Sequence, residues 1–155
     1  MMPRISRETS TYRTLHDAVD LVPPHEGYGA AGLELLDNPA IRAVEQFVQT
    51  GYPTDAAAIL LCELDGSSAD VMAQVERVEA VLRDAGATGI QVSRDEAERQ
   101  RFWAGRKSAF PAMGRLSPDY YCMDGTIPRK HLAEVLNGIA TLSQEYGLPI
   151  CNVFH

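Results

Sequence analysis

Apolar and polar positions follow a regular pattern from Gly32 onward, after a start with weak periodicity. The run AAAILLCEL at residues 56–64 is apolar almost throughout and lies between polar turns, which predicts a strand buried on both faces. Other short stretches predict further strands. The expected strands are residues 32–36, 56–64, 89–92, 118–128 (with an interruption or bulge near Asp124 and Gly125) and 149–155.

Helical spacing of apolar residues fills the intervals between these strands. Four helices are expected: one after residue 37, one after residue 67, a charged helix from residue 93 to about Pro111, and one after Pro128. Capping side chains mark the helix starts, and glycines mark the ends. These signals are Asp37 followed by Pro39, Ser67 with Asp70, Ser93 with Glu96, and the stops at Gly86 and Gly147.

The alternation of strands and helices predicts an α+β fold, a two-layer sandwich of the ferredoxin-like type. Residues 1–30 contain paired prolines and several glycines, and they predict a poorly ordered segment with a short helical turn near residues 14–22. The domain is therefore expected to span residues 31–155. Because the final residues PICNVFH predict a strand with no turn or polar tail after it, we expect a truncated domain whose open sheet edges favour self-association.

Composition favours a globular chain without a membrane span. Of the 155 residues, 45% are hydrophobic and 23% are charged, and no apolar run approaches the length of a transmembrane helix. Cys62, Cys122 and Cys151 form no close pair, and the N-terminus lacks the apolar region of a signal peptide, so we expect a cytoplasmic protein. The formal net charge of −7 argues against nucleic-acid binding.

Charge is unevenly distributed along the chain. Residues 99–130 hold seven basic and two acidic side chains, a local charge of +5, so the rest of the chain carries −12. A local cationic surface on an acidic protein favours a small anionic ligand over a polyanion. A solvated basic helix face explains the same pattern equally well, and charge alone does not separate the two interpretations.

No catalytic motif is complete within the sequence. Glycine-rich nucleotide loops, the zinc motif H-E-x-x-H and the nucleophile elbow G-x-S-x-G are absent, and the four histidines do not have metal-site spacing. On the charged helix, Phe102, Arg106 and Phe110 share one face. Two interpretations stay open: Arg106 offers its guanidinium to a ligand carboxylate in a shielded pocket, or the aromatic residues are core and Arg106 pairs with an acid.

Longer stretches resemble one known family. The stretches are GLELLDNPAIRAVEQF, GYPTDAAAILLCELDG, WAGRKSAFP, PDYYCMDGTIPR and the terminal NVFH. The chain resembles the C-terminal, substrate-side domain of FAD-linked oxidases, the group that contains the glycolate oxidase flavin subunit and the D-lactate dehydrogenases. The resemblance covers residues 31–155. It implies an incomplete form of that domain, and the oxidation of a 2-hydroxy acid to the 2-oxo acid with hydride transfer to FAD.

The resemblance also implies roles for two residues. Arg106, in the W-x-x-R-K run, is expected to bind the substrate carboxylate. His155 is expected to be catalytic, as the first histidine of the family's H-x-G-D-G-N-x-H stretch, which lies beside the flavin and in several members ligates a divalent metal. The rest of that stretch does not occur in this sequence, and no cofactor-binding residue is assigned. Cys122 and Phe110 stand where dicarboxylate-oxidising relatives carry lysine and threonine, which favours a small monoacid.

These inferences predict a partial substrate domain of a flavin-dependent dehydrogenase or oxidase of the glycolate or D-lactate type, inactive unless a separate flavin-domain chain completes it. The alternative is a small ferredoxin-like module that senses an organic acid or dimerises, and such a module would bind its acid without flavin. A third interpretation, a partly folded product of a broken gene, predicts poorly cooperative thermal unfolding.

Overall fold

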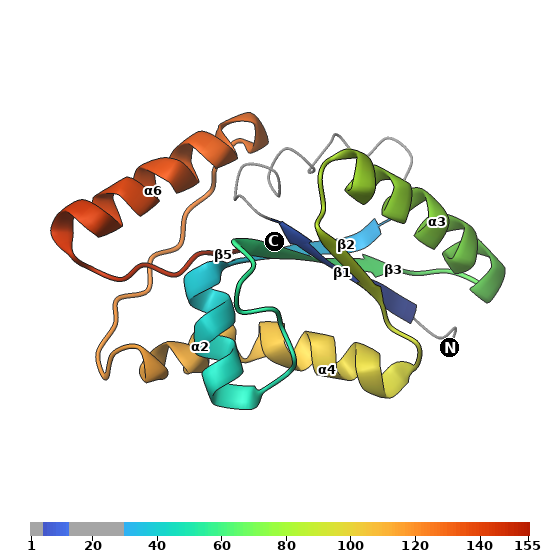
Figure 1. Ribbon diagram of the computed structural model, residues 1–155, viewed down its shortest axis with the longest axis horizontal. Helices are drawn as coiled ribbons and strands as arrows, with labels where there is room; N and C mark the ends of the chain where they lie inside the picture. The colour runs from blue at the N-terminus through green and yellow to red at the C-terminus, as the bar shows by residue number, and fades with distance from the viewer. Residues whose placement is uncertain (1–4, 13–29) are drawn as a thin grey trace.

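A five-stranded antiparallel sheet forms the centre of the computed structural model, which describes residues 5–12 and 30–155 (Figure 1). The strands are β1 (Ile5–Tyr12), β2 (Ala30–Asp37), β3 (Ala58–Leu64), β4 (Gly89–Val92) and β5 (Val153–Phe154), in the order β4-β1-β3-β2-β5. Helix α3 (Ser68–Asp84) connects β3 to β4, and β1 lies between those two strands. These elements form a split βαβ unit of the kind found in ferredoxin-like folds.

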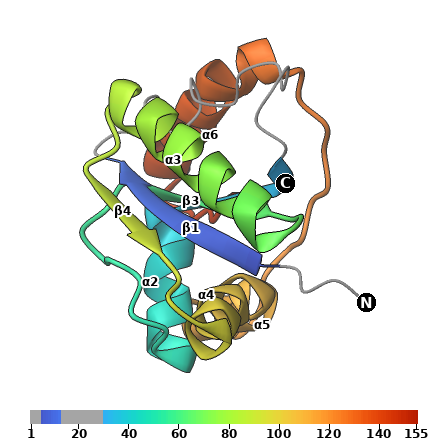
Figure 2. The same cartoon turned by 90° about the vertical axis from the view of Figure 1, so that its right-hand side faces the viewer.

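Helices cover both faces of this sheet. On one face lie α3 and α6 (Leu132–Tyr146), and on the other lie α2 (Asn38–Val48), α4 (Glu96–Lys107) and the short α5 (Ala109–Ala112) (Figure 2). Two 3-10 turns, η1 (Met113–Arg115) and η2 (Arg129–His131), complete the described helical segments. The predicted α+β class is confirmed. The described helices, however, place the sheet between two helical layers, where the pattern predicted a two-layer sandwich.

The second helical layer follows from the composition of the central strand. In β3, Leu60 and Leu64 pack toward α3 and α6, while Ile59 and Leu61 pack toward α2 and α4. All four side chains are at most 2% exposed. A strand that is apolar on both faces needs cover on both faces, because apolar area left in water costs free energy in proportion to its extent. The strand predicted from the continuous apolar run is therefore confirmed.

The helix starts follow the predicted caps at two of three places. Asp37 accepts a hydrogen bond from the backbone N–H of Ala40 at the start of α2, and Ser67 accepts one from the N–H of Asp70 at the start of α3. At α4 the predicted Ser93–Glu96 capping box is wrong. Asp95 is the cap there and accepts from the N–H of Glu98, while Ser93 is buried before the helix begins.

The N-terminal part of the sheet differs from the prediction for residues 1–30. Residues Ile5–Tyr12 form β1, which pairs with β3 on one side and with β4 on the other. The sequence ISRETSTY has β-branched and aromatic residues, which favour strands, but few apolar ones. A prediction from the hydrophobic pattern therefore does not detect this strand. These residues therefore belong to the sheet and are not a poorly ordered segment. The helical turn predicted near residues 14–22 lies outside the described residues.

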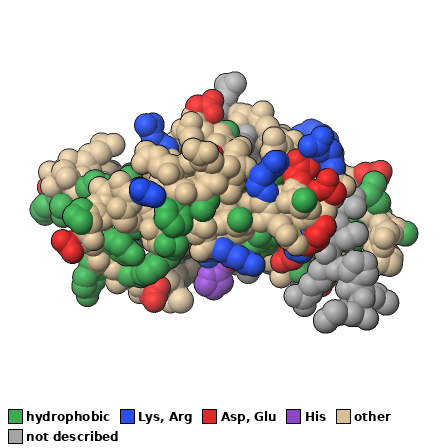
Figure 3. All heavy atoms as spheres, turned by 90° about the horizontal axis from the view of Figure 1, so that it is seen from below, with side chains coloured by type: hydrophobic (Ala, Val, Ile, Leu, Met, Phe, Trp, Pro, Cys, Tyr) green, Lys and Arg blue, Asp and Glu red, His purple; other side chains and the backbone are tan. Residues whose placement is uncertain are grey.

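The strand predicted at residues 118–128 does not form. This segment connects η1 to η2 without strand pairing, and Tyr121 and Met123 are 87% and 76% exposed. Prolines bound the segment at both ends, and no described strand runs beside it to bond its backbone groups. Hydrophobic side chains gather at the end of the molecule where this segment and α6 lie, on the left of Figure 3. Within the described residues, no helix is both long and apolar enough to cross a membrane.

Candidate carboxylate-binding site

Arg106 lies in the last turn of α4 and forms an ion pair with β2. Its Nε donates to Oε2 of Glu34 at 2.6 Å, and the side chains of Arg106 and Glu34 are only 25% and 18% exposed. The pair therefore lies in a partly shielded environment, where it is screened less than a surface pair. The interpretation in which Arg106 pairs with an acid is correct for Nε. A guanidinium carries five N–H donors in a planar arrangement, so the Nη edge of Arg106 is separate from the edge that contacts Glu34.

Gly105, the residue before Arg106, allows α4 to approach the loop between α2 and β3 closely. A Cβ atom at this position would lie 2.5 Å from ring atoms Cε2 and Cζ of Tyr52, well inside van der Waals contact. Tyr52 is buried, and its hydroxyl donates to the backbone carbonyl of Phe102 one turn earlier in α4. Burial raises the pKa of Tyr52, so the hydroxyl stays protonated and remains a donor. Contact between a glycine and an aromatic ring therefore sets the position of Arg106.

The loop that carries Tyr52 is held by one carboxylate of α2. Glu45 accepts hydrogen bonds from the backbone N–H groups of Thr50, Gly51 and Tyr52 at 2.9–3.0 Å, and from the Thr50 hydroxyl at 2.5 Å. Four donors on one carboxylate define the loop conformation just after α2 ends. The support of Arg106 thus continues from α4 through Tyr52 to α2.

His155 follows β5, and the strand register brings it toward the same place. In the β2–β5 pair, Leu36 lies opposite Val153 and Leu35 lies opposite Phe154. One further step in this register places His155 opposite Glu34. Opposite residues in an antiparallel pair point to the same face, with Cβ atoms about 4.5–5.5 Å apart. That face is the α4 side, because Leu36 and Val153 both pack in the cluster with Phe102 of α4.

The two residues singled out from the sequence are therefore brought together around Glu34. Arg106 contacts Glu34 directly, and the register carries His155 to the neighbouring position on an adjacent strand. His155 is exposed, so a ligand has access to it. The arrangement offers a cation for a carboxylate and an imidazole for a neighbouring hydroxyl, which are the two groups of a 2-hydroxy acid.

The described residues do not fit a complete metal or flavin site. No cluster of three or more His, Cys, Asp or Glu side chains suited to a metal ion occurs among them, and one imidazole alone holds a divalent ion weakly. A flavin dinucleotide needs backbone N–H groups at a helix start for its pyrophosphate. The β3–α3 turn has such a shape at Gly66, but the Asp70 carboxylate lies in the first turn of α3 and repels an anion.

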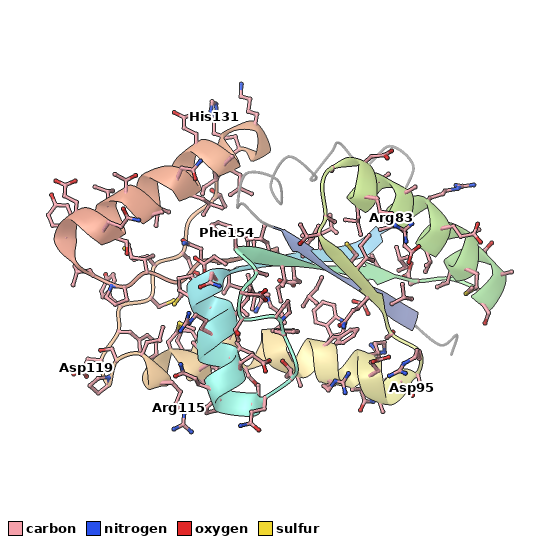
Figure 4. The ribbon with its side chains drawn as sticks, viewed as in Figure 1. Arg83, Asp95, Arg115, Asp119, His131 and Phe154 are labelled. Carbon is pink, nitrogen blue, oxygen red and sulfur yellow. The ribbon has the colours of Figure 1, made fainter. Side chains whose placement is uncertain are left out.

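Three arginines of the basic segment, residues 99–130, pair with acids from outside it. Arg99 pairs with Glu96, Arg101 with Glu98 at 3.1 Å, and Arg106 with Glu34. Arg115, which points to the periphery in Figure 4, lies over the ring of Phe47, with 5.5 Å from its Cζ to the ring centroid. Two of these arginines also have a partner on the sheet: Arg99 pairs with Glu63 of β3 at 3.8 Å, and Arg106 pairs with Glu34 of β2. Arg106 is the one whose partner lies on the strand that pairs with β5.

Sequence reasoning missed the partners that define this site. Glu34 had a signal, because a charged residue within the apolar strand GLELL requires a counter-charge. Gly105 also had one, because an isolated glycine inside a helix indicates a close contact. Phe110 and Cys122 are exposed, and Phe110 makes an edge-to-face ring contact with Tyr120 at 5.5 Å. No described contact connects them to Arg106.

Comparison with known proteins adds the family to this geometry. A family model described as FAD linked oxidases, C-terminal domain, matches residues 5–155. The chain belongs to this family. The match includes β1, in agreement with the position of that strand inside the sheet and earlier than the predicted boundary at residue 31.

Members of the family with similar sequences are glycolate oxidase subunits. The subunit GlcD of Escherichia coli strain K12 is 64% identical over 124 residues, which are 80% of this chain and 25% of that protein. GlcD of Bacillus subtilis strain 168 is 34% identical over 125 residues, 81% of this chain and 27% of that protein. The chain thus spans about a quarter of the length of these relatives.

A solved structure supports the family fold. An alkyldihydroxyacetonephosphate synthase superposes with a TM-score of 0.72 and covers 98% of this chain and 33% of its own. The sequence identity is 12%, so the similarity concerns the fold alone.

Substitution of Gly105 tests the contact that positions Arg106. We expect Gly105→Ala to lower the free energy of unfolding by about 1–3 kcal/mol, because the added methyl group overlaps the Tyr52 ring. The matched control is Gly138→Ala in α6, where no atom lies within 4 Å of the added Cβ. We expect that control to be stabilising by about 0.5–1 kcal/mol. Chemical denaturation measures both, and equal stability of Gly105→Ala and the parent chain would contradict the contact.

Thiol reactivity tests the environment of Cys151. Burial, and then the charge of Asp37, raise the pKa of Cys151 to about 12, whereas Cys122 is exposed. Because the thiolate is the reactive form, we expect an alkylating reagent at mildly alkaline pH to modify Cys122 well before Cys151. Mass spectrometry of peptides sampled over time gives the order of labelling. Faster labelling of Cys151 than of Cys122 would contradict the buried position and raised pKa of Cys151.

Proposed function

We propose that this chain is the substrate-side part of a flavin-dependent 2-hydroxy-acid dehydrogenase or oxidase of the glycolate or D-lactate type, and that it is inactive alone. The observation that carries the proposal is the Arg106–Glu34 pair, partly buried and placed on the face toward which the β2–β5 register brings His155. The similarity to two glycolate oxidase subunits supports the substrate class.

In this proposal Arg106 binds the substrate carboxylate through its Nη edge. Glu34 holds the Nε edge, which fixes the orientation of the guanidinium and balances its charge when no substrate is present. A positioned arginine loses less conformational freedom when it binds a planar carboxylate, and each charged hydrogen bond contributes about 1.5–3 kcal/mol. Because Glu34 already balances one cation, the pair suits a monocarboxylate better than a dicarboxylate.

His155 is the proposed catalytic residue, with its imidazole directed at the substrate hydroxyl. A histidine that is hydrogen-bonded to a hydroxyl can take its proton as a general base. A divalent metal at His155 would need further ligands, and the described residues do not supply them. Because the Asp70 carboxylate opposes a pyrophosphate at the β3–α3 turn, we propose that a separate flavin-domain chain supplies FAD. A cytoplasmic location is part of the proposal, supported by three cysteines that form no disulfide.

The visible absorbance of the purified chain tests the first part of the proposal. We expect no stoichiometric flavin before or after addition of FAD, and no oxidation of glycolate or D-lactate, because the Asp70 carboxylate opposes a pyrophosphate at the β3–α3 turn. Release of flavin by denaturation serves as the control for weak colour. Stoichiometric bound FAD with turnover would show that the chain is a complete enzyme.

The role of Arg106 is tested in a chimera in which residues 31–155 replace the matching quarter of Escherichia coli GlcD. We expect Arg106→Ala to lower kcat/KM for glycolate by roughly 10- to 150-fold, the equivalent of about 1.5–3 kcal/mol. The control Arg101→Ala removes an arginine of the same helix whose side chain is 53% exposed and pairs with Glu98. Unchanged kcat/KM in Arg106→Ala, or an equal loss in Arg101→Ala, would refute the carboxylate assignment.

A further inference from the structure

A buried carboxylate joins the last residues of the chain to the middle of the sheet. Oδ1 of Asp37 accepts from the N–H of Ala40, and Oδ2 accepts from the backbone N–H of Asn152 at 2.9 Å and from its Nδ2 at 2.7 Å. The N–H of Asp37 donates in turn to the carbonyl of Asn152 at 3.2 Å. Asp37 is 6% exposed. Three hydrogen bonds therefore connect two residues that are 115 positions apart in the sequence.

Capping of α2 alone does not explain this arrangement. A serine or asparagine caps a helix as well as an aspartate does. Burial raises the pKa of Asp37, so ionisation at this position has a cost that the accepted hydrogen bonds offset. A carboxylate differs from a serine in having two oxygens with room for several donors. Oδ1 of Asp37 accepts the capping hydrogen bond of α2, and Oδ2 accepts the two hydrogen bonds from Asn152.

The short strand β5 needs an additional element to fix its register. β5 pairs with β2 over only two residues, Val153 and Phe154. A shift by one residue moves every side chain of a strand to the other face, and short pairings specify register weakly. Such a shift would turn His155 away from Arg106 and toward the α3 and α6 side. Asn152 stands immediately before β5, where its attachment to Asp37 excludes this shift.

We propose that Asp37 and Asn152 are positioning residues, a latch that sets the register of β5 and thereby places His155 opposite Glu34 and beside Arg106. Phe154, labelled in Figure 4, supports this register, because it lies opposite Leu35 of β2 and packs against the core cluster on the α3 and α6 face. The inference deepens the proposed function, on which the role of His155 depends. The register itself can be tested without any activity.

The test compares cross-strand nuclear Overhauser contacts in the full chain and in Asn152→Ala. In the parent chain we expect contacts between β2 and β5 in the register Leu36–Val153, and contacts between the His155 ring and the Glu34 side chain. Asn152→Ala removes the side-chain hydrogen bond and keeps the two that use the backbone of residue 152, so we expect both sets to weaken while contacts between β2 and β3 persist. The exchanged pair Asp37→Asn with Asn152→Asp restores the side-chain hydrogen bond, and we expect it to recover the register contacts in part.

Asn38→Ala is the matched control. Nδ2 of Asn38 also makes two long-range hydrogen bonds, to the carbonyls of Thr54 and Ala56, but neither involves β5. We expect this variant to lose stability and to keep the β2–β5 contacts. Contacts of unchanged strength in Asn152→Ala would overturn the latch, and so would an equal weakening in Asn38→Ala. The GlcD chimera separates the two proposals: if Arg106→Ala leaves its kcat/KM for glycolate unchanged, the proposed function fails while the register result still decides the latch.

Discussion

The carboxylate of Asp37 is the interaction on which both halves of the candidate site depend. Through Oδ1 it starts α2, and through Oδ2 it holds the segment that leads into β5. Helix α2 carries Glu45, which shapes the loop of Tyr52, and Tyr52 supports α4 beneath Arg106. Strand β5 leads to His155. Arg106 and His155, which are far apart in the sequence, thus both depend on the buried Asp37 carboxylate for their positions.

The sheet explains why such a device is needed. Its central strands are buried between two helical layers and are fixed by apolar packing over many residues. The edge strand β5 has two paired residues and gains little from packing by itself. Directional hydrogen bonds to a buried carboxylate supply the specificity that so short a strand lacks. The same reasoning applies to Glu34, whose partial burial makes its pair with Arg106 more directional than the exposed pairs along α4.

Local signals in the sequence predicted a large part of this structure. The continuous run of β3, the caps at Asp37 and Ser67, and the ends of α3 and α6 at glycines depend on neighbouring residues, and all were recovered. β1 was missed because its pairing with β3 and β4, rather than its own pattern, makes it a strand. Arg106 was singled out from the helix pattern, and the family resemblance predicted roles for both Arg106 and His155. Glu34 and Asn152 were not singled out, because their partners lie 72 and 115 positions away.

The most direct test of this account is a glycolate titration of the chimera with Escherichia coli GlcD, loaded with FAD and labelled with ¹⁵N in its arginine side chains. The account predicts a saturable change in the Nε–Hε signal of Arg106, no comparable change for Arg101, and no change with ethylene glycol, which lacks the carboxylate. If the Arg106 signal stays unchanged at glycolate concentrations that shift other residues, the Arg106–Glu34 pair is a structural ion pair and not the beginning of a substrate site.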